Sequence, residues 1–182
     1  IQRIKIVQEG SWTVLQIPFR KPDPIISVIE LVMKGNEITV DNTQALDPEI
    51  GTNELSVIFA EAKDCHVYKS SWMEKFGEWK HEYCVSNLNR GGKIIWTVDV
   101  KSPGTYQVEL KVRGNGRVVW KVETDEGQMA QNQQSVSSIF CKRPIGWIRF
   151  DKPGRHTITV SMPEGVEQAD MSAISMTPIY FE

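Results

Sequence analysis

The sequence lacks the features that mark a membrane protein or a polyanion-binding protein. No apolar run approaches the roughly 20 residues needed to span a bilayer, and no amphipathic basic helix is evident. The 182 residues carry a formal net charge of −2 without a cluster of Lys and Arg. Neither a membrane nor a nucleic acid is therefore expected as a partner.

Cysteine is scarce. Cys65, Cys84 and Cys141 are too few and too widely spaced for a disulfide framework or a CxxC-type zinc site. At most one pair can form a bridge. We therefore expect either three ordinary buried or partly buried thiols, or one disulfide and one free thiol.

Motifs of catalysis are missing as well. The sequence has no nucleophile elbow, P-loop or dinucleotide fingerprint. His66, His81 and His156 do not fall at metal-ligand spacing. Many carboxylates are expected in turns or at outward strand positions, as solvated surface: Asp99, Glu109, Glu123, Asp125, Glu126 and Asp151. Hydrolysis of a glycoside needs two carboxylates facing each other in a pocket, so we predict no enzymatic activity for this chain.

What the sequence does contain is the two-residue period of β-strands. Between Lys93 and Glu123, apolar residues recur at every second position, which is typical of strands with one face on a core. Pro103-Gly104 and Gly114-Asn115-Gly116 supply the tight turns between three such strands, which predicts a meander. Further strands are expected at Val57–Ala60, His66–Lys69, Ser135–Phe140, Trp147–Phe150 and Met171–Thr177.

The number and spacing of these strands predict an all-β fold, a jelly-roll-like β-sandwich preceded by a short segment of β-strands. Residues 1–50 are expected to be closing strands of an upstream sandwich or an accessory layer, and residues 54–182 the main sandwich. Within residues 1–50, strands are expected at Trp12–Ile17, Ile25–Met33 and Glu37–Val40. The stretch Asp41–Asn53, rich in Asn, Asp and Pro, is the expected linker. The chain begins at Ile1 rather than Met, which predicts a processed product or an excised piece.

Aromatic residues are the main candidates for a binding site. Trp72, Trp79 and Tyr83 lie in a polar segment, Lys69–Gly92, without strand alternation, which we interpret as a loop. In a loop each ring could be a stacking platform for a ligand, or a plug that closes one end of the sandwich. The side chain of Asn132 could hydrogen-bond a polyol.

Three other tryptophans are interpreted differently. Trp96, Trp120 and Trp147 occupy strand positions with inward alternation, so we expect them in the core.

Three segments carry a resemblance: Ala60-Glu61-Ala62, the stretch GKIIWTVDVKSPGTY from Gly92 to Tyr106, and KPGRHTI from Lys152 to Ile158. Together they resemble carbohydrate-binding modules of families 6 and 35, over about residues 54–182. The resemblance implies a β-jelly roll and glycan binding, for which Trp72, Trp79, Tyr83 and Asn132 are the candidate residues named above.

The same resemblance implies a structural calcium ion held by an early Glu and by an Asp on the last strand. The matching positions are Glu61 and Asp170. Oxygen ligands suit calcium. The alternative is an ion pair of Glu61 with Lys63, a position at which the family carries an acidic or neutral residue.

The upstream segment IPFRKPDPIISVIEL, from Ile17 to Leu31, resembles the end of the β-sandwich that follows the catalytic barrel in bacterial α-L-fucosidases of glycoside hydrolase family 29. This implies a non-catalytic C-terminal region of a secreted or periplasmic enzyme, with the catalytic barrel and fucosylated or other glycans as partners. Two functions remain open. The chain either packs on the barrel as a structural domain, which predicts buried Trp72 and Trp79, or it is an autonomous glycan-binding module, which predicts an exposed aromatic beside a groove.

Overall fold

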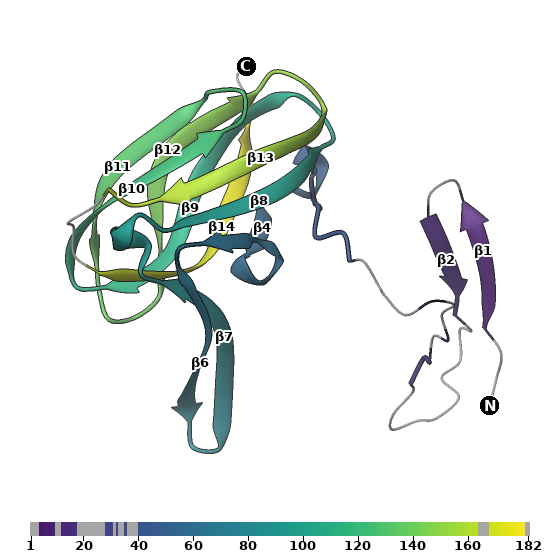
Figure 1. Ribbon diagram of the computed structural model, residues 1–182, viewed down its shortest axis with the longest axis horizontal. Coiled ribbons are helices and arrows are strands. Elements are labelled where there is room, and N and C mark those ends of the chain that lie inside the picture. Colours follow the sequence, from purple (N-terminus) through teal and green to yellow (C-terminus); the bar gives the residue numbers. More distant parts are fainter. Residues whose placement is uncertain are drawn as a thin grey trace. The chain divides into compact units, whose positions relative to one another are not determined.

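A computed structural model describes residues 4–9, 12–17, 28–30, 32, 35, 40–163 and 168–180 (Figure 1). The chain divides into two compact units, Ile1–Val40 and Asp41–Glu182. In the first, β1 (Lys5–Glu9) and β2 (Trp12–Gln16) form an antiparallel hairpin in which Val7 lies opposite Val14. The strands expected at Ile25–Met33 and Glu37–Val40 fall largely outside the described residues.

The second unit is a sandwich of two six-stranded sheets. Sheet 1 has the order β11-β10-β13-β8-β3, with β5 also paired to β8, and sheet 2 has the order β12-β9-β14-β7-β6, with β4 also paired to β14. The strands run as follows: β3 Gln44–Leu46, β4 Asn53–Ser56, β5 Glu61–Lys63, β6 His66–Lys75, β7 Glu78–Ser86, β8 Lys93–Val100, β9 Gly104–Gly114, β10 Gly116–Thr124, β11 Met129–Val136, β12 Cys141–Phe150, β13 Gly154–Ser161 and β14 Ala169–Ile179. Three short 3₁₀ turns, η1 (Pro48–Ile50), η2 (Val57–Phe59) and η3 (Leu88–Arg90), complete the described elements.

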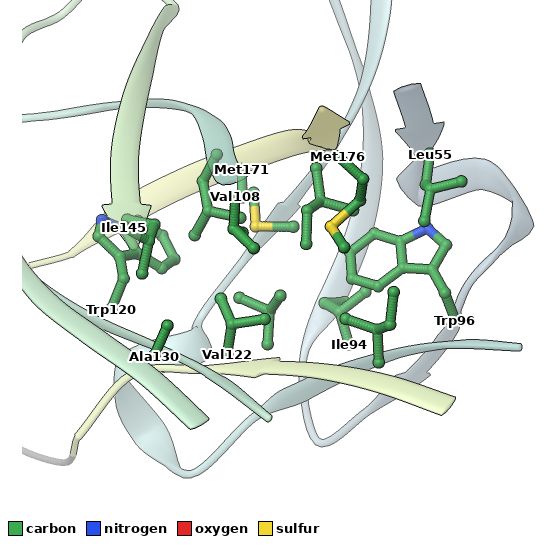
Figure 2. Packing of buried hydrophobic residues seen from close by; sticks show 14 of the residues in the cluster. Leu55, Ile94, Trp96, Val108, Trp120, Val122, Ala130, Ile145, Met171 and Met176 are labelled. Carbon is green, nitrogen blue, oxygen red and sulfur yellow. The ribbon is translucent and has the colours of Figure 1, made fainter. Parts of the chain in front are cut away.

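The predicted fold class is confirmed, and so is the alternation that indicated it. The inward positions of β8, β9 and β10 are buried, among them Trp96 and Trp120. Figure 2 shows both indoles with Val108, Met171 and other apolar side chains in the layer between the sheets. The indole Nε1 of Trp96 donates a hydrogen bond to the carbonyl of Ser56 at 2.9 Å, which satisfies its buried polar atom.

The predicted meander is wrong. β8 and β10 belong to sheet 1 and both pair with β13, whereas β9 belongs to sheet 2 between β12 and β14. Each connection therefore crosses from one sheet to the other, as in a jelly roll. Alternation identifies the buried face of a strand, and both sheets bury the same kind of face, so the pattern does not identify the partner strand.

The unit boundary lies between Val40 and Asp41 rather than near residue 50. β3 pairs in parallel with β8, Leu46 on β3 is fully buried, and the amide of Asn53 donates to the carbonyl of Asp47 at 2.9 Å. The stretch Asp41–Asn53 is therefore part of the sandwich and not a linker.

One further detail differs from the sequence prediction, and another agrees with it. Val57–Phe59 is a 3₁₀ turn capped by the Ser56 hydroxyl rather than a strand. The cysteines are free, with Cys84 buried and Cys65 and Cys141 partly buried, as the first alternative predicted. Among the described residues, no helix has the length and apolar character needed to cross a membrane.

Candidate functional site

The segment interpreted as a loop is a β-hairpin. β6 and β7 are antiparallel strands at the edge of sheet 2, and Figure 1 shows the hairpin projecting away from the body of the sandwich. The strands are joined at Phe76-Gly77, where Gly77 has a φ of +80°, a conformation that glycine adopts without strain. Strand alternation was missed because polar and large side chains occur on both faces of a ribbon that is solvated on both sides.

The register of the hairpin separates the three aromatic candidates. Residues directly opposite each other share a face, and faces alternate along each strand. Trp79 lies opposite Met73, and Tyr83 opposite Lys69, so both rings are on one face. Trp72 lies opposite Lys80 and is on the other face of the hairpin.

The face that carries Trp79 and Tyr83 combines aromatic and polar groups; we call it the aromatic face. Trp79 is 59% exposed and Tyr83 41% exposed. His81 lies between them, and its Nδ1 is 2.7 Å from the hydroxyl of Ser71 on β6. At roughly 3.3 Å per residue the two rings are about 13 Å apart along β7, so one oligosaccharide could contact both.

The opposite face is continuous with the outer surface of sheet 2. Trp72 is 38% exposed there. Closer to the sandwich, Glu82 accepts a hydrogen bond from the Nζ of Lys111 on β9. The side chain of Glu82 is only 18% exposed. This pair anchors β7 to the sheet. Among the contacts described, Trp72 and Trp79, which lie nearer the tip of the hairpin, form no such hydrogen bond with the sandwich.

The exposure of the hairpin contradicts the second alternative for these rings, a plug that closes one end of the sandwich. Trp72 and Trp79 are exposed rather than buried, and Phe76 at the tip is fully exposed. Leu88 on η3 is buried in the core, as a plug residue would be. Sequence reasoning did not single out His81 or Ser71, because their pairing depends on the hairpin register.

Asn132 lies far from the hairpin in the sheet order. It is on β11, the edge strand of sheet 1 that meets β12, and its Nδ2 lies 3.5 Å from the carbonyl of Pro144. The structure therefore does not bring Asn132 together with Trp72, Trp79 and Tyr83.

Trp147 is exposed rather than part of the core. Its side chain is 62% exposed on β12. Ile148 and Phe150 take the inward positions, and Trp147 pairs with Gln107, an outward residue of β9. The core prediction for Trp147 is therefore wrong, because the alternation of β12 places it on the outer surface of sheet 2.

The two candidate calcium ligands lie on different sheets. Glu61, on β5, is 3.4 Å from the Nζ of Lys63, the ion pair named as the alternative. Asp170, on β14, accepts hydrogen bonds from the hydroxyl of Tyr68 and from the Nε of Arg113. Within the described residues, no three His, Cys, Asp or Glu side chains are grouped so that they could hold a metal ion. These donor sets do not fit calcium, and we derive no role for a metal.

Known structures resemble the sandwich, whereas two sequence comparisons find no match. Comparisons with protein-family models and with curated protein sequences give no match. The GH26-CBM35 β-(1,4)-mannanase of Podospora anserina aligns over 72% of this chain and 28% of its own, with a TM-score of 0.59 and 14% identity. The C-terminal family 6 carbohydrate-binding module of a laminarinase from Zobellia galactanivorans aligns over 69% of this chain and 98% of its own, with a TM-score of 0.51 and 15% identity.

A third structure has a different function. The mosquito-larvicidal Cry4Aa toxin from Bacillus thuringiensis aligns over 78% of this chain and 26% of its own, with a TM-score of 0.60 and 10% identity. The chain thus spans about a quarter of the length of the mannanase and of the toxin. At such low identity the likeness establishes the jelly-roll fold, which is shared by carbohydrate-binding modules and a toxin, and function must be argued from the site.

Proposed function

We propose that this chain is a non-catalytic accessory region of a glycoside hydrolase and that it binds glycan through the aromatic face of the β6–β7 hairpin. The observation that carries the proposal is the row of Trp79, His81 and Tyr83, in which two exposed rings flank a hydrogen-bonded imidazole. The apolar face of a sugar packs on such rings, while neighbouring polar groups bond its hydroxyls. The fold shared with modules of families 6 and 35 supports this function.

The finer parts of the proposal rest on the resemblance of the segment from Ile17 to Leu31. They are an α-L-fucosidase as the parent enzyme, fucosylated glycans as ligands, the catalytic barrel as the neighbouring domain and a secreted or periplasmic location. The parent's catalytic carboxylates would belong to that barrel.

Calorimetry of the 182-residue chain against fucosylated, plant and mucin oligosaccharides tests the proposal. Trp79→Ala should weaken binding at least tenfold, which corresponds to about 1.4 kcal/mol. Trp147→Ala is a matched control, because Trp147 is equally exposed, at 62%, but lies on β12. Saturable binding of neutral oligosaccharides that survives in the Trp79 variant, or that Trp147→Ala also removes, would contradict the assignment of the site.

A second function, packing against the catalytic domain, is favoured by the fully exposed ring of Phe76 at the tip. Met73 and Trp79, which lie opposite each other near the same end of the hairpin, are also exposed, and a group of exposed apolar side chains is typical of a surface that a partner covers. In the complete enzyme, Phe76→Ser would then lower the thermal midpoint of the catalytic domain without changing glycan affinity. An unchanged midpoint would rule out this role for the tip.

A further inference from the structure

A polar cleft lies at the opposite edge of the sandwich from the hairpin. It follows β11 and β12, the edge strands at which sheets 1 and 2 meet, and has a volume of about 460 Å³. The lining residues are Arg117, Gln133, Gln134, Ser135, Arg143 and Pro144. The cleft therefore contains two cations and no carboxylate.

The two arginines of this cleft differ from three of the four other arginines of the sandwich. Arg113, Arg149 and Arg155 each form an ion pair with an aspartate, at 3.1, 2.7 and 2.7 Å. Over the described residues, neither Arg117 nor Arg143 has a carboxylate within 4.0 Å. Their positive charge is thus not neutralised within the described fold.

Hydrogen bonds fix the cleft in place. The Nε of the partly buried Arg143 donates to the carbonyl of Ser135 at 2.8 Å, and the Nε2 of Gln134 donates to the carbonyl of Pro144 at 2.7 Å. A β-bulge between Pro144 and Gly146 breaks the pairing of β12 with β9 at this point, and proline suits a bulge because it has no N–H to donate. The terminal nitrogens of Arg143 therefore remain available to a ligand in the cleft.

From this arrangement we infer that the β11–β12 cleft is a subsite for an anionic sugar, one that carries a carboxylate or a sulfate group. The inference rests on the proposed glycan-binding function. A guanidinium group binds carboxylate or sulfate oxygens with two parallel hydrogen bonds, and Gln133 and Gln134 supply amide groups for neighbouring hydroxyls. No aromatic ring lines the cleft, so stacking of a neutral sugar does not explain it. Asn132, predicted from the sequence to bind a sugar, contacts the same Pro144 carbonyl.

Calorimetry with three matched probes tests the inference: trigalacturonic acid, its neutral methyl ester and a sulfated galactose trisaccharide. The 182-residue chain should bind at least one acidic probe, at least tenfold more tightly than the ester, and rising salt should weaken this binding. The two acidic probes distinguish a carboxylate from a sulfate ligand.

Three variants locate the binding. Arg117→Gln should reduce affinity for the acidic probe at least tenfold, and so should Arg143→Gln. Arg143 also bonds the Ser135 carbonyl, so its variant can perturb the fold, whereas Arg117 has no such contact and keeps the test decisive. Arg149→Gln removes the same charge from the outer surface of sheet 2 and should bind like the wild type.

The outcomes separate this inference from the proposed function. Acidic binding that is unchanged in Arg117→Gln, or that is lost in Trp79→Ala instead, would overturn the subsite. Trp79-dependent binding of neutral glycans with no preference for acidic probes would also overturn it, and would leave the proposed function standing. Absence of binding to every glycan would overturn both.

Discussion

Asp170 on β14 lies opposite Arg113 on β9, and its carboxylate accepts a hydrogen bond from the arginine Nε at 3.1 Å. The same carboxylate accepts a hydrogen bond from the hydroxyl of Tyr68. That hydroxyl in turn accepts a hydrogen bond from the Nη2 of Arg113 at 2.8 Å. The guanidinium group also lies 4.7 Å above the ring of Phe140. These contacts join the base of the hairpin to the sandwich.

Asp170→Asn should destabilise the chain by about 1–3 kcal/mol, because it removes the charge that pairs with a partly buried guanidinium group. Urea unfolding measures the change. We expect calcium and EDTA to leave the wild-type midpoint unchanged, in line with the ion pairs of Asp170 and Glu61. A calcium-dependent rise that Asp170→Asn and Glu61→Gln each abolish would instead establish the metal site.

Stability should fall at high pH through Tyr68. Burial, and then the hydrogen bond to Asp170, raise the pKa of the Tyr68 hydroxyl from 10.0 to about 12. The folded state thus retains a proton that the unfolded state loses, so the contribution is complete below pH 10.0 and disappears as the pH rises through about 12. Tyr68→Phe should flatten this decline in urea unfolding measured across the window. Burial also raises the pKa of Tyr106, so part of the decline should remain. An identical slope in the variant would show that Tyr68 is not responsible.

Gly92 should tolerate no side chain. A Cβ there would lie 2.8 Å from the Cβ of Cys65 and 2.9 Å from the carbonyl oxygen of Asp64. Gly92→Ala should therefore cost about 1–3 kcal/mol of unfolding free energy. Gly104→Ala is the control, since its Cβ would be no closer than 3.8 Å to Tyr106. Equal effects of the two substitutions would contradict the steric explanation.

The unit boundary can be tested by truncation. A chain of residues 41–182 should unfold cooperatively, since it retains β3 and the buried Leu46. A chain that starts at residue 54 loses both, and its thermal midpoint should be clearly lower. Equal midpoints would mean that the stretch 41–53 adds nothing to the sandwich.

The parts of the fold that the sequence predicted are those set by local patterns. Alternating apolar residues identified the buried faces of β8, β9 and β10, and the Pro-Gly turns marked where strands begin. Strand pairing was not predictable, because it depends on which sheet receives each strand. Trp147 was misplaced because an aromatic residue fits either face of a strand whose inward positions are taken by Ile148 and Phe150.

The site was predicted in part, for a similar reason. The aromatic content of residues 69–92 drew attention to the correct segment. Only the register, however, shows that Trp79 and Tyr83 share a face from which Trp72 is excluded. The β11–β12 cleft could not be foreseen, because Arg117 and Arg143 lie on strands of different sheets. Their lack of acidic partners follows from the three-dimensional arrangement alone.

The projecting hairpin also has a dynamic consequence. Beyond Glu82, which Lys111 anchors to sheet 2, β6 and β7 have mainly each other as support, and an isolated pair of strands is marginally stable in water. Its outer amides should therefore exchange with solvent through local opening, well before the sandwich unfolds. A ligand on the aromatic face would have to immobilise this ribbon, so part of its interaction energy would be spent on ordering, and slower amide exchange confined to residues 69–83 would be its signature.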